Sequence, residues 1–243
     1  MTEEIIEVIE TRWSLIQHAH SSGQPESASD ARRLLVLRYS PAIRRYVGGI
    51  VRNDDLADEL SQELLLRLMR GDFGGANPSF GRFRDFLKMA IRNLARTAWQ
   101  KSQRRKTVDV ELDLIGSDAG DSADREWTDQ WRKSVLDHAW NRFLMDQGGK
   151  STAGYQALKL KMEFPDADSD ELAERLSHQT GTAIRADNFR QILKRARTRF
   201  AAHLFDEVRA GLESESIASL EEELSALGLL DFVRHDLPAS QGE

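Results

Sequence analysis

The apolar residues of this chain recur every three or four positions over most of its 243 residues, and this period constrains the fold more than any other feature. Leucines repeat at every fourth position from Leu56 to Leu68, and the apolar residues between Phe83 and Ala98 follow a 3.6-residue period. Such periods are typical of amphipathic helices, whereas no segment shows the convincing alternation of a half-buried strand. We therefore expect an all-α protein.

Breaks in this period divide the chain into regions of different composition. The stretch GSDAGDSAD, at 116–124, is polar and acidic, as linkers often are. Turn-forming residues interrupt the pattern at GDFGGANPS, residues 71–79, and Pro41 is expected to kink or split a helix over 29–51. The expected organisation is a first helical domain over 1–106, an acidic linker over 107–126, a second helical domain over 127–205 and an acidic extension over 206–243.

Composition excludes several classes of protein. The chain has no cysteine, which rules out disulfide scaffolds and thiolate zinc sites and fits a reducing cytosol. The opening residues MTEEIIEVIE lack the basic and apolar regions of a secretory signal, and no apolar run approaches the roughly 18 residues of a membrane span. We therefore expect a cytoplasmic protein that does not cross a membrane.

The formal net charge of −6 conceals a strong alternation along the chain. Residues 82–106 hold nine Lys and Arg against one acid, a balance of +8, and residues 185–199 have a balance of +5. Residues 107–126 have a balance of −6, and residues 206–243 a balance of −8. Because local fields decide whether a polyanion is attracted, the pattern indicates two nucleic-acid contacts on separate units.

Residues 82–106 form one basic amphipathic helix in this interpretation. Its cations step by four along one side, and such a stripe can neutralise several phosphates of a nucleic-acid strand. A solvated charged face is the alternative, but such faces normally interleave acids with bases, and this helix does not. Asn93 adds hydrogen bonds for a base edge or a phosphate, while Trp99 fits either the core or a stacked base. The candidate cations are Arg84, Lys88, Arg92, Arg96, Lys101, Arg104 and Arg105.

The second basic block lies in a helix–turn–helix pattern, in which SDELAERLS at 169–177 supports a candidate recognition helix at 186–200. The turn between them, HQTGTAI, is longer than the usual three or four residues, and similar helix pairs occur in proteins that do not bind DNA. The residues expected in the small core are Leu172, Ala173, Leu176, Phe189, Ile192, Leu193 and Ala196. The outward side chains suited to base edges or phosphates are Asn188, Arg190, Gln191, Lys194, Arg195, Arg197 and Arg199.

The segment NDDLADELSQE, at 53–63, predicts an acidic helix surface. Its acids favour docking of a basic protein surface. The DDxxD spacing also occurs in metal sites, but such a site needs a second acidic cluster and a large apolar cavity, which the sequence does not clearly offer. No calcium loop, phosphate-binding glycine loop or catalytic triad signature is present. We therefore expect no enzyme activity, no metal and no cofactor.

Three segments, in this order, resemble a known family. They are DLADELSQELLLRLMRG at 55–71, FGRFRDFLKMAIRNLARTAWQKSQRRK at 80–106, and DELAERLS with NFRQILKRARTRF after the acidic stretch. The first two resemble region two, and the last resembles the end of region four, of bacterial sigma factors of the extracytoplasmic-function (group IV) class. The early TRWSLI and the acidic tail resemble the subset of this class that is common in planctomycetes. The resemblance covers residues 10–205.

The resemblance implies a two-domain all-α fold, with region two over 1–106 and a region-four helix–turn–helix domain over 127–205. The acidic linker would thread the polymerase toward its active site. The loop 72–80, ending at Phe80, matches the loop that holds a flipped base of the minus-ten element. Residues matching the surface that docks the clamp helices of RNA polymerase are Asp55, Asp58, Glu59, Gln62 and Glu63.

The resemblance also implies which residues meet promoter DNA. Those matching the strand-melting helix at the minus-ten element are Arg84, Lys88, Arg92, Asn93 and Arg96, followed by Lys101, Arg104 and Arg105. Those matching the reading positions for the minus-thirty-five element are Asn188, Arg190, Gln191 and Lys194, with Arg195 and Arg197 beside them.

The predicted function is that of a promoter-specificity subunit of bacterial RNA polymerase, which directs transcription initiation and has no catalysis of its own. Its partners would be core polymerase (through the clamp helices and flap), promoter DNA, and an anti-sigma factor or other regulatory protein. The free subunit is expected to bind promoter DNA poorly, because its acidic segments compete for the basic faces. Two alternatives stay open: a stand-alone helix–turn–helix regulator, and an interaction protein dominated by the acidic tail.

Overall fold

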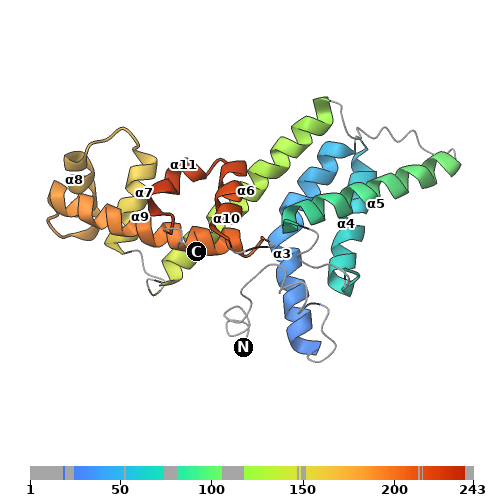
Figure 1. Cartoon of the computed structure of the whole chain (residues 1–243), viewed down its shortest axis with the longest axis horizontal. Coiled ribbons are helices and arrows are strands. Elements are labelled where there is room, and N and C mark those ends of the chain that lie inside the picture. Colours follow the sequence, from blue (N-terminus) through green and yellow to red (C-terminus); the bar gives the residue numbers. More distant parts are fainter. Residues whose placement is uncertain are drawn as a thin grey trace. The chain divides into compact units, whose positions relative to one another are not determined.

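The computed structural model describes residues 19, 25–51, 53–73, 81–105, 118–146, 148, 152–212, 214 and 216–238. Every regular element within these residues is a helix, so the all-α prediction is confirmed for them (Figure 1). The chain divides into two compact units. Unit 1 comprises Met1–Ser134 and Arg209–Ser219, and unit 2 comprises Val135–Val208 and Leu220–Glu243.

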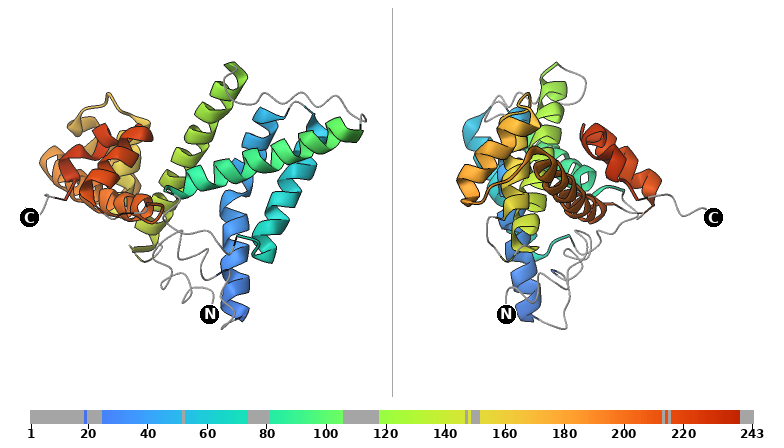
Figure 2. Two further views of the ribbon diagram at one scale, coloured as in Figure 1. Left: turned by 45° about the vertical axis from the view of Figure 1, so that its right-hand side comes forward. Right: turned by 90° about the vertical axis from the view of Figure 1, so that its left-hand side faces the viewer.

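In unit 1, α3 (Pro25–Ile50) and α4 (Asp54–Arg70) lie side by side, and α5 (Phe83–Arg105) runs across them (Figures 1 and 2). Arg32 Nη1 donates to the main-chain oxygen of Met69 at 3.3 Å, which ties the first half of α3 to the end of α4. The expectation that Pro41 splits its helix is wrong, since α3 continues through it. Pro41 is exposed, so the hydrogen bond it removes is lost on the solvent side of the helix.

The ends of α4 follow from local sequence. The Asn53 side chain accepts a hydrogen bond from the Leu56 N–H at 2.8 Å, and this N-cap satisfies one of the unpaired donors of the first turn. At the other end Gly71 adopts the left-handed conformation, with φ of 80°, and its N–H closes the last turn onto Arg67 and Leu68. The sequence favours Asn53 or Asp54 as the N-cap and Gly71 as the stop, and the structure has Asn53 and Gly71 in these roles. The leucines at 60, 64 and 68 are buried, as their spacing predicted.

Helix α6 (Asp118–Asp146) begins inside the predicted linker, whose first part lies outside the described residues. Its first half belongs to unit 1, where Trp127 and Trp131 are buried against aromatic rings of α3 and α5. Trp131 stacks on Tyr39 with a centroid separation of 5.3 Å. The division between units therefore falls after Ser134, whereas the sequence placed a domain boundary at 127. The helical spacing of these tryptophans favours burial in a core, but it does not indicate which unit buries them.

Unit 2 contains the second half of α6 together with α7 (Ala153–Glu163), α8 (Ser169–Thr180) and α9 (Ala186–Arg209). Most of the predicted core residues cluster between α8 and α9, and Ala157 and Leu160 of α7 belong to the same cluster. Ala196 instead packs in a neighbouring cluster with Phe143 and Leu158. The remaining elements of this part of the chain are α10 (Ile217–Ala226), α11 (Leu230–Val233) and the 3-10 turn η2 (Arg234–Asp236).

The connection between α8 and α9 is shorter than the sequence suggested. Helix α8 runs on to Thr180 and ends at Gly181, which takes the left-handed conformation with φ of 67°. Only Gly181–Arg185 connects the helices, so the pattern lies close to the usual length for the motif. The candidate recognition helix, α9, starts at Ala186, as expected.

Candidate nucleic-acid interface

The acidic face of α4 is open to solvent. Asp55, Asp58, Glu59 and Gln62 are exposed, while Glu63 is half-buried and forms an ion pair with Arg67 at 2.8 Å. The carboxylates are thus held on a rigid helix with their negative charge facing outward. A surface of this kind suits a basic protein partner better than nucleic acid.

The same face continues into two apolar side chains that the sequence analysis did not single out. Leu66 and Met69 are 47% and 44% exposed. They follow Glu59 and Gln62 at alternating steps of four and three, which keeps all of them on one side of the helix. The spacing was therefore visible in the sequence, although exposure was not. The face combines an acidic half with an apolar half, as the core and rim of a protein interface do.

The predicted cation ladder of α5 does not stay on one side of the helix. Each step of four residues advances about 40° past a full turn, so three steps rotate the side chain by about 120°. Arg84 is accordingly buried, with 7% exposure, whereas Arg96 and Lys101 are exposed. Lys88 and Arg92 lie between these extremes. Asn93 is exposed beside Arg96 on the outer surface.

Lys88 and Arg92 meet an acid from α6. Asp124 receives hydrogen bonds from Arg92 Nη2 at 2.9 and 3.0 Å, one on each carboxylate oxygen, and from Lys88 Nζ at 3.3 Å. Tyr46 of α3 donates its hydroxyl proton to Asp124 at 2.8 Å and accepts from Arg92 Nε at 2.7 Å. We call Tyr46, Lys88, Arg92 and Asp124 the Asp124 cluster. Sequence reasoning missed it because Asp124 stood in the expected linker.

The electrostatics of the cluster favour the ionised carboxylate. Partial burial by itself raises the pKa of Asp124, but the hydrogen bond from Tyr46 and the charges of Lys88 and Arg92 outweigh it, so this pKa lies below its usual value. Burial, followed by the hydrogen bond to Asp124 and the carboxylate charge, raises the pKa of Tyr46. At neutral pH the cluster thus contains one negative and two positive groups.

Other predicted residues near α5 are only partly placed. Phe80 lies outside the described residues, and so do the side chains of Arg104 and Arg105, although both belong to the helix. Trp99 is half-buried. Met89, which the sequence did not single out, is 54% exposed on the outer surface near Asn93 and Arg96.

The recognition-helix candidates on α9 are all exposed. Phe189 of the same helix is buried, in the core that α9 shares with α7 and α8. Arg190 forms an ion pair with Asp187 one turn earlier. The predicted minus-thirty-five residues therefore occupy two adjoining exposed faces of α9, one with Asn188, Gln191 and Arg195 and one with Arg190, Lys194 and Arg197.

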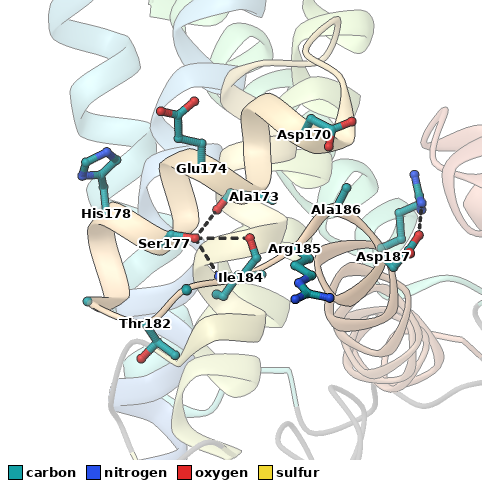
Figure 3. A pocket seen from close by; sticks show the side chains of 13 residues that line it. Asp170, Ala173, Glu174, Ser177, His178, Thr182, Ile184, Arg185, Ala186 and Asp187 are labelled. Atoms are coloured by element: carbon teal, nitrogen blue, oxygen red, sulfur yellow. Dashed lines mark hydrogen bonds and ion pairs between the residues drawn. The ribbon is translucent and has the colours of Figure 1, made fainter.

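Ser177 fixes the approach to that helix. Its hydroxyl donates to the Ala173 carbonyl at 2.7 Å and accepts from the Ile184 N–H at 2.9 Å, which joins the end of α8 to the connection (Figure 3). An open pocket of about 930 Å³ lies here, lined by both acids and bases, among them Asp170, Glu174 and Arg185. Within the described residues, no group of three or more His, Cys, Asp or Glu side chains could hold a metal ion.

The acidic extension reaches the far part of the same helix. Thr198 Oγ1 of α9 donates to Asp236 Oδ1 at 2.7 Å, so η2 docks beyond the predicted reading positions. Leu220, Leu224 and Val233 are buried, which shows that this part of the extension has a packed side.

Comparison with known proteins adds one family. Residues 35–105 match the family model of sigma-70 region 2. The match supports a sigma-70 family factor. It covers α3 from Leu35 onward, together with α4 and α5. Asp124 and all of unit 2 lie outside it. No curated protein and no solved structure gives a significant match to the chain.

The region-2 match gives the acidic and basic surfaces a common context. Sigma region 2 implies contact with core RNA polymerase and with promoter DNA. Both the exposed acids of α4 and the outer cations of α5 lie inside the matched span. In the part of the chain that the structure describes, no helix is both long and apolar enough to cross a membrane.

Proposed function

We propose that this chain is a promoter-specificity subunit of bacterial RNA polymerase, of the extracytoplasmic-function class. The observation that carries the proposal is the sigma-70 region 2 match at 35–105, which holds one exposed acidic face and one basic helix within a single unit. Such a subunit has no catalysis of its own and acts in the cytoplasm, where polymerase and promoter DNA meet. Its contribution to transcription initiation is binding energy.

The acidic face of α4 would dock the clamp helices of core polymerase. Asp55, Asp58, Glu59 and Gln62 supply the outer charge and hydrogen bonds, and Leu66 and Met69 supply apolar area beside them. Charges at the rim steer association, while buried apolar contacts contribute more to affinity. Because Glu63 is already paired with Arg67, we assign it a smaller part than its exposed neighbours.

Helix α5 would hold the displaced strand of the minus-ten element, together with Phe80 from the preceding loop. The exposed Asn93, Arg96 and Lys101 are the groups that can reach phosphate or a base edge without first losing an intramolecular partner seen in the structure. Binding to the single strand offsets the free energy of unpairing the duplex.

Helix α9 would read the minus-thirty-five element in the major groove. Asparagine, glutamine and arginine side chains can each form paired hydrogen bonds with one base edge. Asn188 and Gln191 supply these groups on one exposed face of α9 and Arg190 on the adjoining one, and Arg195 and Arg197 suit the flanking phosphates. The polymerase flap would hold this domain at its promoter element.

Charge reversal on α4 tests the proposal. Glu59→Lys should weaken binding to core polymerase at least tenfold in a pull-down or anisotropy titration, because it places a cation against a basic surface. Asp129→Lys is the matched control, since Asp129 is also exposed in unit 1 but lies on α6. Equal binding by both variants would refute the docking role of α4.

A stand-alone helix–turn–helix regulator is the second candidate, and the fully exposed reading surface of α9 favours it. It differs from the first in needing no polymerase. Sequence-specific duplex binding by the free chain, unchanged by Glu59→Lys and by added core polymerase, would select this alternative.

A further inference from the structure

Asp124 accepts hydrogen bonds from Lys88 and Arg92, two of the α5 cations that the sequence predicts to contact nucleic-acid phosphate. Carboxylate and phosphate oxygens bind Lys and Arg through the same charge-assisted hydrogen bonds. Asp124 receives such bonds from both Lys88 and Arg92, at 3.3 and 2.9 Å. It comes from α6, outside the region-2 match, so the matched helix is neutralised by a different part of the chain.

We propose that Asp124 is a resident competitor for nucleic-acid phosphate at Lys88 and Arg92, and that it lowers the affinity of the free chain for single strands. The inference rests on the proposed function, in which α5 contacts the promoter strand. It adds a regulatory residue to that site. While Asp124 pairs with Lys88 and Arg92, these two cations are not available to phosphate, and the free subunit binds unrelated polyanions less tightly.

The competitor stays in place because α6 is anchored. Trp127 and Trp131 are 1% and 2% exposed, and they contact Tyr46, Tyr39 and Phe83. Releasing this part of α6 would return two large aromatic side chains to water, which opposes release. Asp124 therefore acts as an intramolecular ligand at high effective concentration.

The cluster is also open enough for exchange. The side chains of Lys88, Arg92 and Asp124 are 24%, 25% and 33% exposed, so a phosphate can approach without opening the core. The Asp124 carboxylate is ionised at neutral pH, because its pKa lies below the usual value. A competing anion must therefore displace a charged group and not a neutral one.

Salt-dependent binding to a fluorescein-labelled thymidine oligonucleotide, followed by anisotropy, tests the proposal. Asp124→Asn should bind several-fold more tightly at low salt. Each additional phosphate contact should steepen the slope of log K against log salt by about 0.7, so the change should lie between about 0.7 and 1.4. Asp129→Asn is the matched control, because it also removes one acid from α6, but the ion-pair partner of Asp129, Arg132, lies on α6 itself. Equal affinities and slopes for the two variants would overturn the proposal.

A disulfide between α3 and α6 tests whether Asp124 competes from its place in the folded unit or whether α6 must first move away. A Cβ added at Gly49 would lie 3.1 Å from the Ala123 Cβ, a few tenths of an ångström shorter than the usual Cβ–Cβ separation in a disulfide, so a small shift of either helix would admit the bond. The chain has no native cysteine, so Gly49→Cys with Ala123→Cys can form only this bond within one molecule. In the oxidised double variant, adding Asp124→Asn should still raise affinity. If it raises affinity only after reduction, α6 must leave and the resident role is wrong.

The lock also keeps the test informative if Asp124→Asn destabilises the free chain, because the bond holds α6 against α3.

The measurement of oligonucleotide binding needs no polymerase, so it is independent of the proposed function. An effect of Asp124→Asn in a chain that does not bind core polymerase would support the competitor and refute the sigma function. Normal polymerase binding with no difference between Asp124→Asn and Asp129→Asn would do the reverse.

Discussion

The two basic helices of this protein, α5 and α9, carry similar sequence signals but present their charge differently. Residues 82–106 have a balance of +8 and residues 185–199 a balance of +5. Yet the predicted contacts on α9 are all exposed, while in α5 Arg84 is buried and Lys88 and Arg92 are paired with Asp124. The segment with the larger formal charge therefore has more of its predicted contact residues buried or paired.

The difference teaches that the formal charge of a segment does not measure its accessible charge. The acid that neutralises α5 is 32 residues away from Arg92 in the sequence. Its influence depends on which unit buries Trp127 and Trp131, which is a tertiary property. On α9, by contrast, the nearby acid Asp187 pairs with Arg190 alone, and the other cations stay on the open side.

The largest expected effect comes from removing the anchor of α6. Trp127→Ala should lower the free energy of unfolding by about 3–5 kcal/mol, because it leaves a cavity among buried aromatic rings. Urea denaturation followed by circular dichroism measures the change. Phe232→Ala is the control, since this ring is 82% exposed and should change stability by no more than about 0.5 kcal/mol. Equal stability of the two variants would contradict the docking of α6 in unit 1.

Matched arginine substitutions sharpen the comparison of the helices. Arg92→Gln should cost about 1–3 kcal/mol of stability, because it breaks the Asp124 cluster and leaves a carboxylate short of donors. Arg190→Gln should change stability by less than about 0.5 kcal/mol but weaken binding to a minus-thirty-five duplex by about 1–3 kcal/mol. Urea titration and duplex anisotropy measure both quantities. If Arg190→Gln lowered stability more than Arg92→Gln does, the cations of α5, and not those of α9, would be the accessible ones.

Acidification should have a smaller effect on stability, through protonation of the Asp124 carboxylate. The pKa of Asp124 is lowered in the folded chain by Tyr46, Lys88 and Arg92, against the opposing effect of burial. A lowered carboxyl pKa gives stability that is present above the unfolded value, about 3.9, and is lost as the pH falls through the folded value. Wild-type protein should thus lose stability relative to Asp124→Asn below about pH 4. If the free energies of unfolding of the wild type and of Asp124→Asn changed in parallel from pH 7 to pH 3, the ionised state of Asp124 in the cluster would be contradicted.

The smallest effect concerns the extension on α9. Thr198→Val removes the hydrogen bond to Asp236, which is exposed, and should cost about 0.5 kcal/mol. Faster amide hydrogen exchange across η2, without change in α8, would confirm local docking. Unchanged exchange in η2 would show that the buried leucines alone hold the extension.

Local features of the fold were readable from the sequence. The Asn53 cap, the Gly71 stop, the leucine stripe of α4 and the core beneath α9 depend on neighbours within one or two turns, and all are present. The outcome at Pro41 was not readable, because it depends on which side of α3 faces water.

The candidate site was readable where exposure follows from the helical period alone. This holds for α9 and for the acidic face of α4. On α5 the four-residue ladder already implied a rotation of about 120° from Arg84 to Arg96. What no period could supply was Asp124, whose partners come from α3 and α5 and whose own segment resembled a linker.

In vitro transcription from fragmented genomic DNA tests the central claim most directly. Core polymerase would be incubated with and without the chain, and the 5′ ends of the transcripts sequenced. We predict chain-dependent start sites that share sequence near minus ten and minus thirty-five, are lost with Glu59→Lys and persist with Asp129→Lys. An absence of chain-dependent starts, with core polymerase shown to be active alongside a known specificity subunit, would contradict the assignment of this protein as a promoter-specificity subunit.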